Sequence, residues 1–311
     1  MTALRFIVGE GEADERLDRV LAGLAGVPRA QAQRWIDAGA VRCNDAAVRA
    51  SQRVALGDVL AAEPPEPTPL SLAPEPMALS VLHEDAALLV LDKPAGLVVH
   101  PAPGHPTGTL VHGLLHHCRD LAGIGGVLRP GIVHRLDAGT SGVMVVAKRD
   151  AVHQALALQF RDHTIERVYH AFVRGMPAAE TGRVERAIGR HRRDRKRMSV
   201  ASRSGRAART AWRIAARYPQ AGVVRLEVRP ETGRTHQIRV HLASAGLPIL
   251  GDPVYGRSRA GVPAGVLLTR PALHAARLGF THPDSGERLV FDAPLPEDLE
   301  ALAAALAAEA A

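Results

Sequence analysis

The sequence lacks several features that would place the protein in a special class. No run approaches the roughly 18 uninterrupted apolar residues of a membrane-spanning helix, so we expect no membrane domain. Only two cysteines occur, Cys43 and Cys118, which excludes a disulfide framework and a four-cysteine zinc site and fits a reducing compartment. Aromatic residues are 3%, too few for the stacking surface of a single-strand binder. The N-terminal 18 residues carry five acidic residues rather than a secretory signal, so we expect a cytoplasmic protein.

Basic charge is present but concentrated in one segment. The 311 residues suggest two domains, and 46% hydrophobic with 23% charged residues is typical of a globular protein. The formal net charge is +7, and residues 183–213 hold 12 Lys/Arg against two acids, Glu185 and Asp194. Such a segment attracts phosphate-rich partners, although a solvated arginine-rich loop would have the same composition.

A proline-rich stretch divides the chain. Residues 63–76 contain six prolines in 14 positions, and proline removes amide donors and stiffens the backbone, so we predict a linker over 63–77. A small α/β module is expected at 1–62 and a larger body at 78–311. We find no internal repeat.

The small module has two helical patterns followed by short strands, with Arg29, Arg34 and Arg42 on its polar side. Its segments RLDRVLAGL, VPRAQAQRWIDAGAVRCND and LGDVL resemble the small RNA-binding domain named after ribosomal protein S-four. Two positions depart from that pattern: Pro28 replaces a common serine, and Asp45 replaces the usual hairpin glycine. The resemblance covers about residues 14–62.

The body mixes strands and helices without a regular βαβ alternation, so we predict an α+β fold rather than a doubly wound sheet. The apolar run 142–147 predicts a buried strand. Helices are predicted over 151–161, capped by Asp150, and over 236–245, capped by Thr235.

Two polar clusters could carry chemistry. The first, GIVHRLDAGTSG at 131–142, places Asp137 on a turn before the buried strand, where a carboxylate can act as nucleophile, general base or metal ligand, or simply pair with Arg135. The second, ETGRTHQIRVH at 231–241, places Arg234 and Arg239 near a helix start, where they could hold an aspartate ionised, bind phosphates or remain in solvent.

Five segments in order resemble the RluA-type pseudouridine synthases, and most closely the RluD branch, which modifies large-subunit ribosomal RNA. They are LDKPAGLVVHP at 91–101, GIVHRLDAGTSGVMVVAK at 131–148, ERVYHAFVRG at 166–175, TGRTHQIRVHLASAGLPILGDPVYG at 232–256 and LHAARLGFTHP at 273–283. This resemblance implies a pseudouridine-synthase catalytic domain, built on a mixed, mainly antiparallel sheet flanked by helices.

The resemblance also implies roles for single residues. Asp137 matches the aspartate needed to cleave the C1′–N1 bond of uridine and rejoin C1′ to C5, and Arg239 matches the arginine that pairs with it. Tyr169 matches the tyrosine that packs against the target base, and Arg135 the arginine that helps displace the target nucleotide. Attack of Asp137 on the sugar carbon, attack on the base and a glycal-type elimination all remain open; we favour the glycal route.

The implied partner is ribosomal RNA or the assembling large subunit, bound by a monomer that needs no cofactor. A non-catalytic RNA-binding assembly factor is the alternative.

His112 and His116 could share a helical face as metal ligands, but no acidic third ligand lies nearby in the sequence, and we predict no metal site. The residues predicted to contact RNA are Arg135, Arg234, Arg29, Arg34, Arg192, Arg193, Arg195, Lys196 and Arg197.

Overall fold

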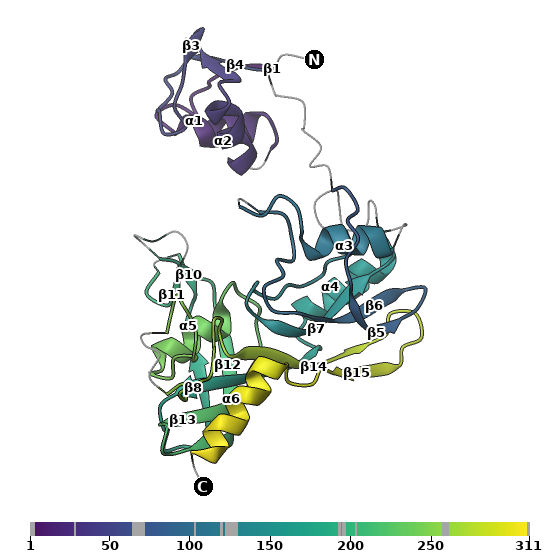
Figure 1. Cartoon of the computed structure of the whole chain (residues 1–311). Helices are drawn as coiled ribbons and strands as arrows, with labels where there is room; N and C mark the ends of the chain where they lie inside the picture. Colours follow the sequence, from purple (N-terminus) through teal and green to yellow (C-terminus); the bar gives the residue numbers. More distant parts are fainter. Residues whose placement is uncertain are drawn as a thin grey trace. The chain divides into compact units, whose positions relative to one another are not determined.

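The computed structural model describes residues 4–27, 29–63, 72–102, 104–118, 121, 130–191, 194, 197–202, 204–256 and 261–309. The chain divides into two compact units, Met1–Ser71 and Leu72–Ala311, which we call the N-terminal and C-terminal units (Figure 1). Most of the predicted linker, residues 64–71, lies outside the described part of the chain. Among the described helices, none has the length and apolar character needed to cross a membrane.

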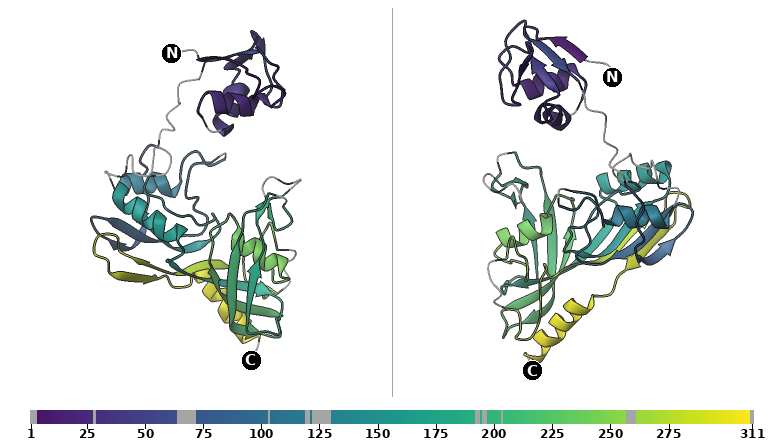
Figure 2. Two further views of the ribbon diagram at one scale, coloured as in Figure 1. Left: turned by 180° about the vertical axis from the view of Figure 1, so that it is seen from behind. Right: turned by 45° about the horizontal axis from the view of Figure 1, so that its top comes forward.

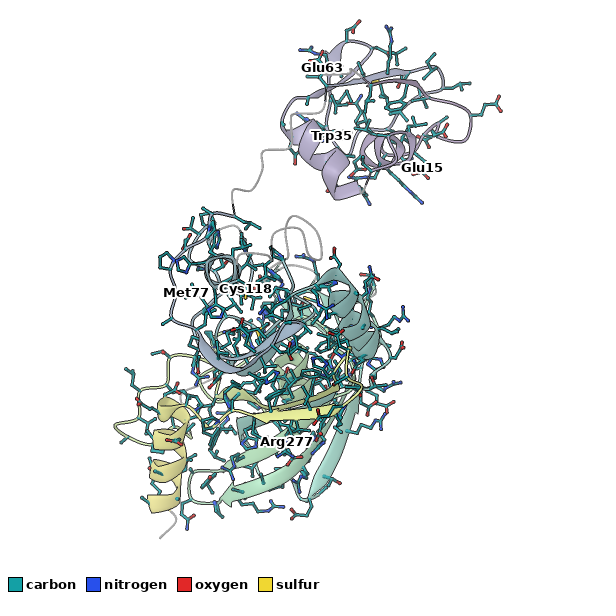
Figure 3. All side chains as sticks on the ribbon, turned by 90° about the vertical axis from the view of Figure 1, so that its right-hand side faces the viewer. Glu15, Trp35, Glu63, Met77, Cys118 and Arg277 are labelled. Atoms are coloured by element: carbon teal, nitrogen blue, oxygen red, sulfur yellow. The ribbon has the colours of Figure 1, made fainter. Side chains whose placement is uncertain are left out.

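The N-terminal unit packs two helices on a small antiparallel sheet of strand order β1-β4-β2-β3. Leu17 of the first helix, Trp35 of the second (Figure 3) and Leu60 of a strand meet in its buried core. Asn44 and Asp45 both have positive φ, as a two-residue hairpin turn requires. The elements are β1 (Leu4–Ile7), α1 (Leu17–Leu24), α2 (Arg29–Asp37), β2 (Val41–Cys43), β3 (Ala46–Ala47) and β4 (Val59–Ala62).

Asp18 is a buried carboxylate inside this unit. It accepts hydrogen bonds from Arg16 at 3.0 Å, Arg29 at 2.9 Å and Gln33 at 2.7 Å. Burial by itself would raise the pKa of Asp18, but these donors outweigh it and hold that pKa well below its usual range. Arg29, a predicted RNA contact, therefore has a structural partner in its own unit while its side chain stays half exposed.

A nine-stranded sheet is the frame of the C-terminal unit. Its strand order is β5-β6-β7-β14-β8-β13-β12-β9, and β15 pairs with β14 beside this path. Among the strand pairs of the described sheet, only β7 with β14 is parallel, which confirms the predicted mixed, mainly antiparallel sheet. The strands are β5 (Ser80–Glu84), β6 (Leu88–Lys93), β7 (Ser141–Ala147), β8 (Glu166–Arg174), β9 (Thr181–Glu185), β12 (Arg209–Tyr218), β13 (Val223–Pro230), β14 (Leu273–Thr281) and β15 (Arg288–Asp292), with a separate pair β10 (Gly189–Arg190) and β11 (Met198–Ser199).

Helices cover both halves of this sheet. Leu89 of β6 packs with Leu114 of α3, whereas its neighbour Leu88 packs with Leu156 of α4. Alternate side chains of a strand point to opposite faces, so β6 is buried on both. Figures 1 and 2 show α3 and α4 beside β5–β7, and α5 and α6 beside β8, β12 and β13. The helices are α3 (Leu110–His117), α4 (Asp150–Arg161), α5 (Gln237–Ser244) and α6 (Glu297–Ala308).

The end of the predicted linker, residues 72–77, is attached to α3. The backbone N–H of Glu75 donates to the carbonyl oxygen of His112 at 3.0 Å. The side chain of Met77, labelled in Figure 3, covers Gly113 so closely that a Cβ added to Gly113 would lie 2.8 Å from it. This stretch therefore belongs to the C-terminal unit.

The predicted helices form, but their predicted caps do not. Helix α4 begins at Asp150 itself, and Arg149 takes the N-cap position. The predicted cap Thr235 is also wrong, because His236 precedes α5 in a left-handed conformation with φ 55° and ψ 21°. A hydrogen bond at 2.9 Å joins the His236 ring to the hydroxyl of Tyr255, a contact that no local sequence signal predicts.

Candidate active site

A cavity of about 500 Å³ lies in the C-terminal unit, between the loop before β7, the end of α4 and the start of α5. Its volume is within the range of roughly 300–1,000 Å³ typical of ligand pockets. Asp137, Tyr169 and Arg239, which we predicted as catalytic, all line this cavity. Arg135 and Arg234 line it as well. The fold thus brings together side chains from three separate stretches of the chain.

The loop that carries Asp137 is held by hydrogen bonds to the backbone carbonyl oxygen of Ala138. The N–H of Gly96 donates to the carbonyl oxygen of Ala138 at 2.8 Å, and the ammonium of Lys93 donates to the same oxygen at 3.3 Å. Lys93 is fully buried, and burial lowers its pKa to about 8. Two further carbonyl oxygens accept from this ammonium at 2.7 and 2.9 Å. These bonds fix the backbone beside Asp137, whose side chain is 19% exposed.

Arg239 connects two carboxylates. Its Nη1 donates to Oδ2 of Asp137 at 3.0 Å, while Nε and Nη2 form a two-pronged contact with Asp252 at 2.7 and 2.9 Å. Asp252 also accepts the backbone N–H groups of Val254 and Tyr255 at 2.9 and 3.1 Å. Burial would raise the pKa of Asp252, but the bonds from Arg239 and these amides outweigh it and lower that pKa. Asp252 therefore anchors Arg239 for its contact with Asp137.

Tyr169 supplies an aromatic wall. It lies on β8, where it pairs with Ala275 of β14 and packs against two hydrophobic clusters. Burial is the main cause that raises the pKa of its phenol, and the nearby carboxylate of Asp137 acts in the same direction. The ring is therefore neutral around pH 7 and can pack against a flat apolar group.

His236 and Tyr255 were missed by the sequence-based prediction of the site. His236 lines the cavity, with its Nε2 3.9 Å from Oδ2 of Asp137. The ring of Tyr255 lies under the guanidinium of Arg239, 5.2 Å from its Cζ. Lys93 and Asp252 were missed too. All four lie within segments that carry the family resemblance, and this position within the segments is the signal that could have found them.

Besides Arg29 in the N-terminal unit, the predicted RNA contacts fall into three groups. Arg135 is exposed at the cavity, and Arg234 donates through Nε to the carbonyl oxygen of Ala207 at 3.2 Å. Arg197 places its guanidinium 5.5 Å from the centre of the Tyr255 ring. The remaining predictions concern side chains outside the described part of the structure: Arg34, Arg192, Arg193, Arg195 and Lys196.

His112, one of the two histidines of α3 considered above as metal ligands, has a partner for one ring nitrogen. The Nδ1 atom of His112 is bonded to the hydroxyl of Thr109 at 2.7 Å in a buried capping box. Within the described residues, ligand-type atoms of Glu84, His117 and Cys118 lie within 4.8 Å of one another. The ammonium of Lys148 lies 2.9 Å from Glu84, so this cluster already holds a cationic partner.

Comparisons with known proteins agree with the fold. The family model for RNA pseudouridylate synthase matches residues 87–244, and the model for the S4 domain matches residues 15–60. The C-terminal unit is similar to the human RNA pseudouridylate synthase domain containing 4, with a TM-score of 0.57, 27% identity, and 73% of this chain and 93% of that chain covered. The chain therefore belongs to the RNA pseudouridylate synthase family, whose members are isomerases that form pseudouridine in RNA.

Relatives extend this match along the whole sequence. An uncharacterized RNA pseudouridine synthase of Bacillus subtilis is 44% identical over 303 residues, which covers 97% of each chain. The ribosomal large subunit pseudouridine synthase D of Neisseria meningitidis serogroup A is 43% identical over 308 residues, covering 96% of this chain and 80% of the relative. The predicted enzyme class and the predicted RNA-binding N-terminal domain are confirmed.

Proposed function

We propose that this enzyme isomerises specific uridines of large-subunit ribosomal RNA, with Asp137 as its catalytic carboxylate. Relatives named ribosomal large subunit pseudouridine synthase D in Neisseria and Zymomonas support the choice of RNA. The observation that carries the proposed chemistry is the 3.0 Å ion pair between Asp137 and Arg239 at the wall of a nucleotide-sized cavity.

The chemistry needs an anion that is shielded from bulk water. Arg239 is 7% exposed and is anchored on Asp252, so it stabilises the ionised form of Asp137 without large side-chain motion. Arg239 donates to Oδ2 of Asp137. Its Oδ1 makes no hydrogen bond within the described residues and is the oxygen available to the substrate.

The reaction requires the target uridine to leave its stack and enter the cavity, at a cost of roughly a few kcal/mol. Arg135, exposed at the cavity, takes the vacated place in the RNA. The C1′–N1 bond breaks and its electron pair stays on the uracil. The ring then turns against Tyr169, C5 bonds to C1′, the C5 proton leaves and N1 gains a proton. No oxidant, group donor or net water is consumed.

RNA affinity comes largely from elsewhere on the protein. The N-terminal S4 domain and the basic segment 183–213 hold phosphates and RNA shape, while the cavity selects the uridine. The partner in this proposal is ribosomal RNA, either free or in an assembling large subunit.

Replacement of Asp137 tests this proposal. Asp137→Asn removes the anion but preserves the size of the side chain, and Arg239 keeps its contact with Asp252. We expect single-turnover pseudouridine formation to fall on the order of 10³-fold or more, with RNA affinity within about twofold of wild type. The measurement is mapping of pseudouridine in large-subunit RNA treated with each protein.

Two results would contradict the proposal. An active Asp137→Asn variant would show that another group performs the chemistry. Wild-type protein that binds ribosomal RNA but forms no pseudouridine in it would favour the RNA-binding assembly factor.

A further inference from the structure

A hydrogen-bond relay fixes which nitrogen of His236 carries the proton. The hydroxyl of Tyr255 accepts the backbone N–H of Met198 at 2.8 Å and lies 2.9 Å from Nδ1 of His236. Burial is the main cause that raises the pKa of this phenol, so Tyr255 keeps its proton. The hydroxyl can then donate its own hydrogen to Nδ1, the arrangement in which the Tyr255 hydroxyl both accepts and donates. In this arrangement the neutral imidazole carries its proton on Nε2.

The Nε2–H group faces the catalytic carboxylate without bonding to it. Nε2 lies 3.9 Å from Oδ2 of Asp137, beyond hydrogen-bond distance, and it has no other hydrogen-bond partner within the described residues. The backbone of His236 is left-handed, which is uncommon outside glycine and is found at functional sites. Nε2–H of His236 is therefore a hydrogen-bond donor that faces the cavity and is available to a molecule bound there. The hydrogen bond to Tyr255 and the left-handed backbone hold it in this position.

The surroundings keep this imidazole neutral. Burial is the largest cause that lowers the pKa of His236, and the positive charges of Arg239 and Arg135 act in the same direction. The carboxylates of Asp137 and Asp252 oppose this shift but do not reverse it. A protonated His236 would pair with Asp137 and reduce its negative charge, so a neutral ring suits a site that depends on that anion.

We propose that His236 is a further catalytic residue, which donates its Nε2–H to a carbonyl oxygen of the uracil while that ring carries negative charge. Tyr255 is the positioning residue that selects the donating tautomer. This inference rests on the proposed function, because it places uracil in the cavity beside Asp137. No proton is transferred: the C1′–N1 electron pair is delocalised onto the uracil oxygens, and a fixed donor there lowers the energy of the anion.

A matched pair of substitutions separates this role from a structural one. In His236→Asn the amide oxygen can replace Nδ1 as acceptor for Tyr255, and asparagine tolerates the left-handed backbone, but no donor reaches the position of Nε2. In His236→Gln the longer amide places an N–H near that position. We expect His236→Asn to lower the single-turnover rate about 100-fold, and His236→Gln to recover it to within about tenfold of wild type. RNA affinity and the unfolding temperature are expected to change little in His236→Asn.

Two further measurements test the relay and the charge state. Tyr255→Phe keeps a ring under Arg239 but removes the hydroxyl, so ¹⁵N NMR of the histidines should show a pure Nε2–H tautomer for His236 in wild type and a mixture in this variant. The neutral form is the active one. The single-turnover rate of the wild type should therefore fall as the pH falls through the lowered pKa of His236. In a plot of rate against pH, His236→Gln should not show this fall, because glutamine does not titrate.

The outcomes distinguish this inference from the proposed function. If wild type is active, Asp137→Asn is inactive and His236→Asn reacts as fast as wild type, then the donor role is wrong while the proposed function stands. The donor role would also be wrong if His236→Asn and His236→Gln lowered the single-turnover rate equally and weakened RNA binding by a matching factor. An Nδ1–H tautomer in the free wild-type enzyme contradicts the relay, whatever the RNA activity.

Discussion

Arg239 is the side chain that links Asp137, the proposed catalytic carboxylate, to the fold. Its contact with Asp137 is a single hydrogen bond, whereas its contact with Asp252 is two-pronged and fully buried on the Asp252 side. A guanidinium held at two points loses little freedom when it makes a third bond. Asp252 thus positions Arg239 for its contact with Asp137, although Asp252 itself does not line the cavity.

Neutralising Asp252 should therefore weaken catalysis more than binding. We expect Asp252→Asn to lower the single-turnover rate roughly tenfold to 100-fold with RNA affinity nearly unchanged, and to lower the free energy of unfolding by about 3 kcal/mol, because one partner of a buried ion pair is lost. Asp292→Asn is the matched control. Asp292 holds Arg277 with the same 2.7 and 2.9 Å geometry on an exposed surface, so less than about 1 kcal/mol should be lost there.

An unchanged rate in Asp252→Asn, or equal destabilisation by both variants, would contradict this role. The two measurements are single-turnover kinetics with excess enzyme and denaturant unfolding of the two variants beside wild type.

Strand β14 is the element that assembles the cavity. Ala275 of this strand pairs with Gly142 of β7 on one side and with Tyr169 of β8 on the other. The loop of Asp137 leads directly into β7. The pairing of β7 and β8 with β14 therefore sets the distance between Asp137 and Tyr169. Gly142 has a φ of +119°, and a Cβ at this position would lie 2.2 Å from the carbonyl oxygen of Ala275. Only glycine permits this close approach.

A methyl group at Gly142 should therefore push β7 and β14 apart at Ala275. We expect Gly142→Ala to lower the free energy of unfolding by about 3 kcal/mol, the sum of roughly 1–2 for the unfavourable φ and 1–3 for the clash, and to reduce activity further. Gly222→Ala is the control, since Gly222 also has a positive φ of +62° but open space around it. It should lose only about 1 kcal/mol in the same denaturant titration; equal losses in both variants would show that the clash is relieved.

At the scale of the whole molecule, the basic segment 183–213 has fewer unpaired arginines than its composition indicates, because carboxylates from outside the segment pair with some of them. Within 183–213 the sequence contains two acids, but the sheet brings two more to it from β13 and the residue after it. Glu231 pairs with Arg183 at 3.0 Å and Arg209 at 2.8 Å, and Glu227 pairs with Arg213. Three of the arginines therefore already have carboxylate partners, and fewer are left for phosphate.

We expect RNA affinity and the chemical step to respond differently to salt. For about four phosphate contacts, a rise from 50 to 200 mM salt should weaken RNA binding about 100-fold, whereas the single-turnover rate at saturating enzyme should change less than about twofold. Filter binding and rapid-quench kinetics on the full chain provide both values. A rate that falls as steeply as affinity would show that phosphate contacts also shape the cavity.

The sequence by itself indicated several helices and strands, the division of the chain by a proline-rich stretch, and the residues proposed for the site. The spacing of apolar residues defines α1, α4 and the buried strand β7, because this spacing reflects which face of an element avoids water. The motif around Asp137 could be found because its residues are contiguous. Only the tertiary structure decided that Asp252 anchors Arg239, that β14 lies between β7 and β8, and that Tyr255 holds His236 in a left-handed turn. These features depend on contacts between residues distant in the chain, and local propensity carries no information about which distant partner a side chain will meet.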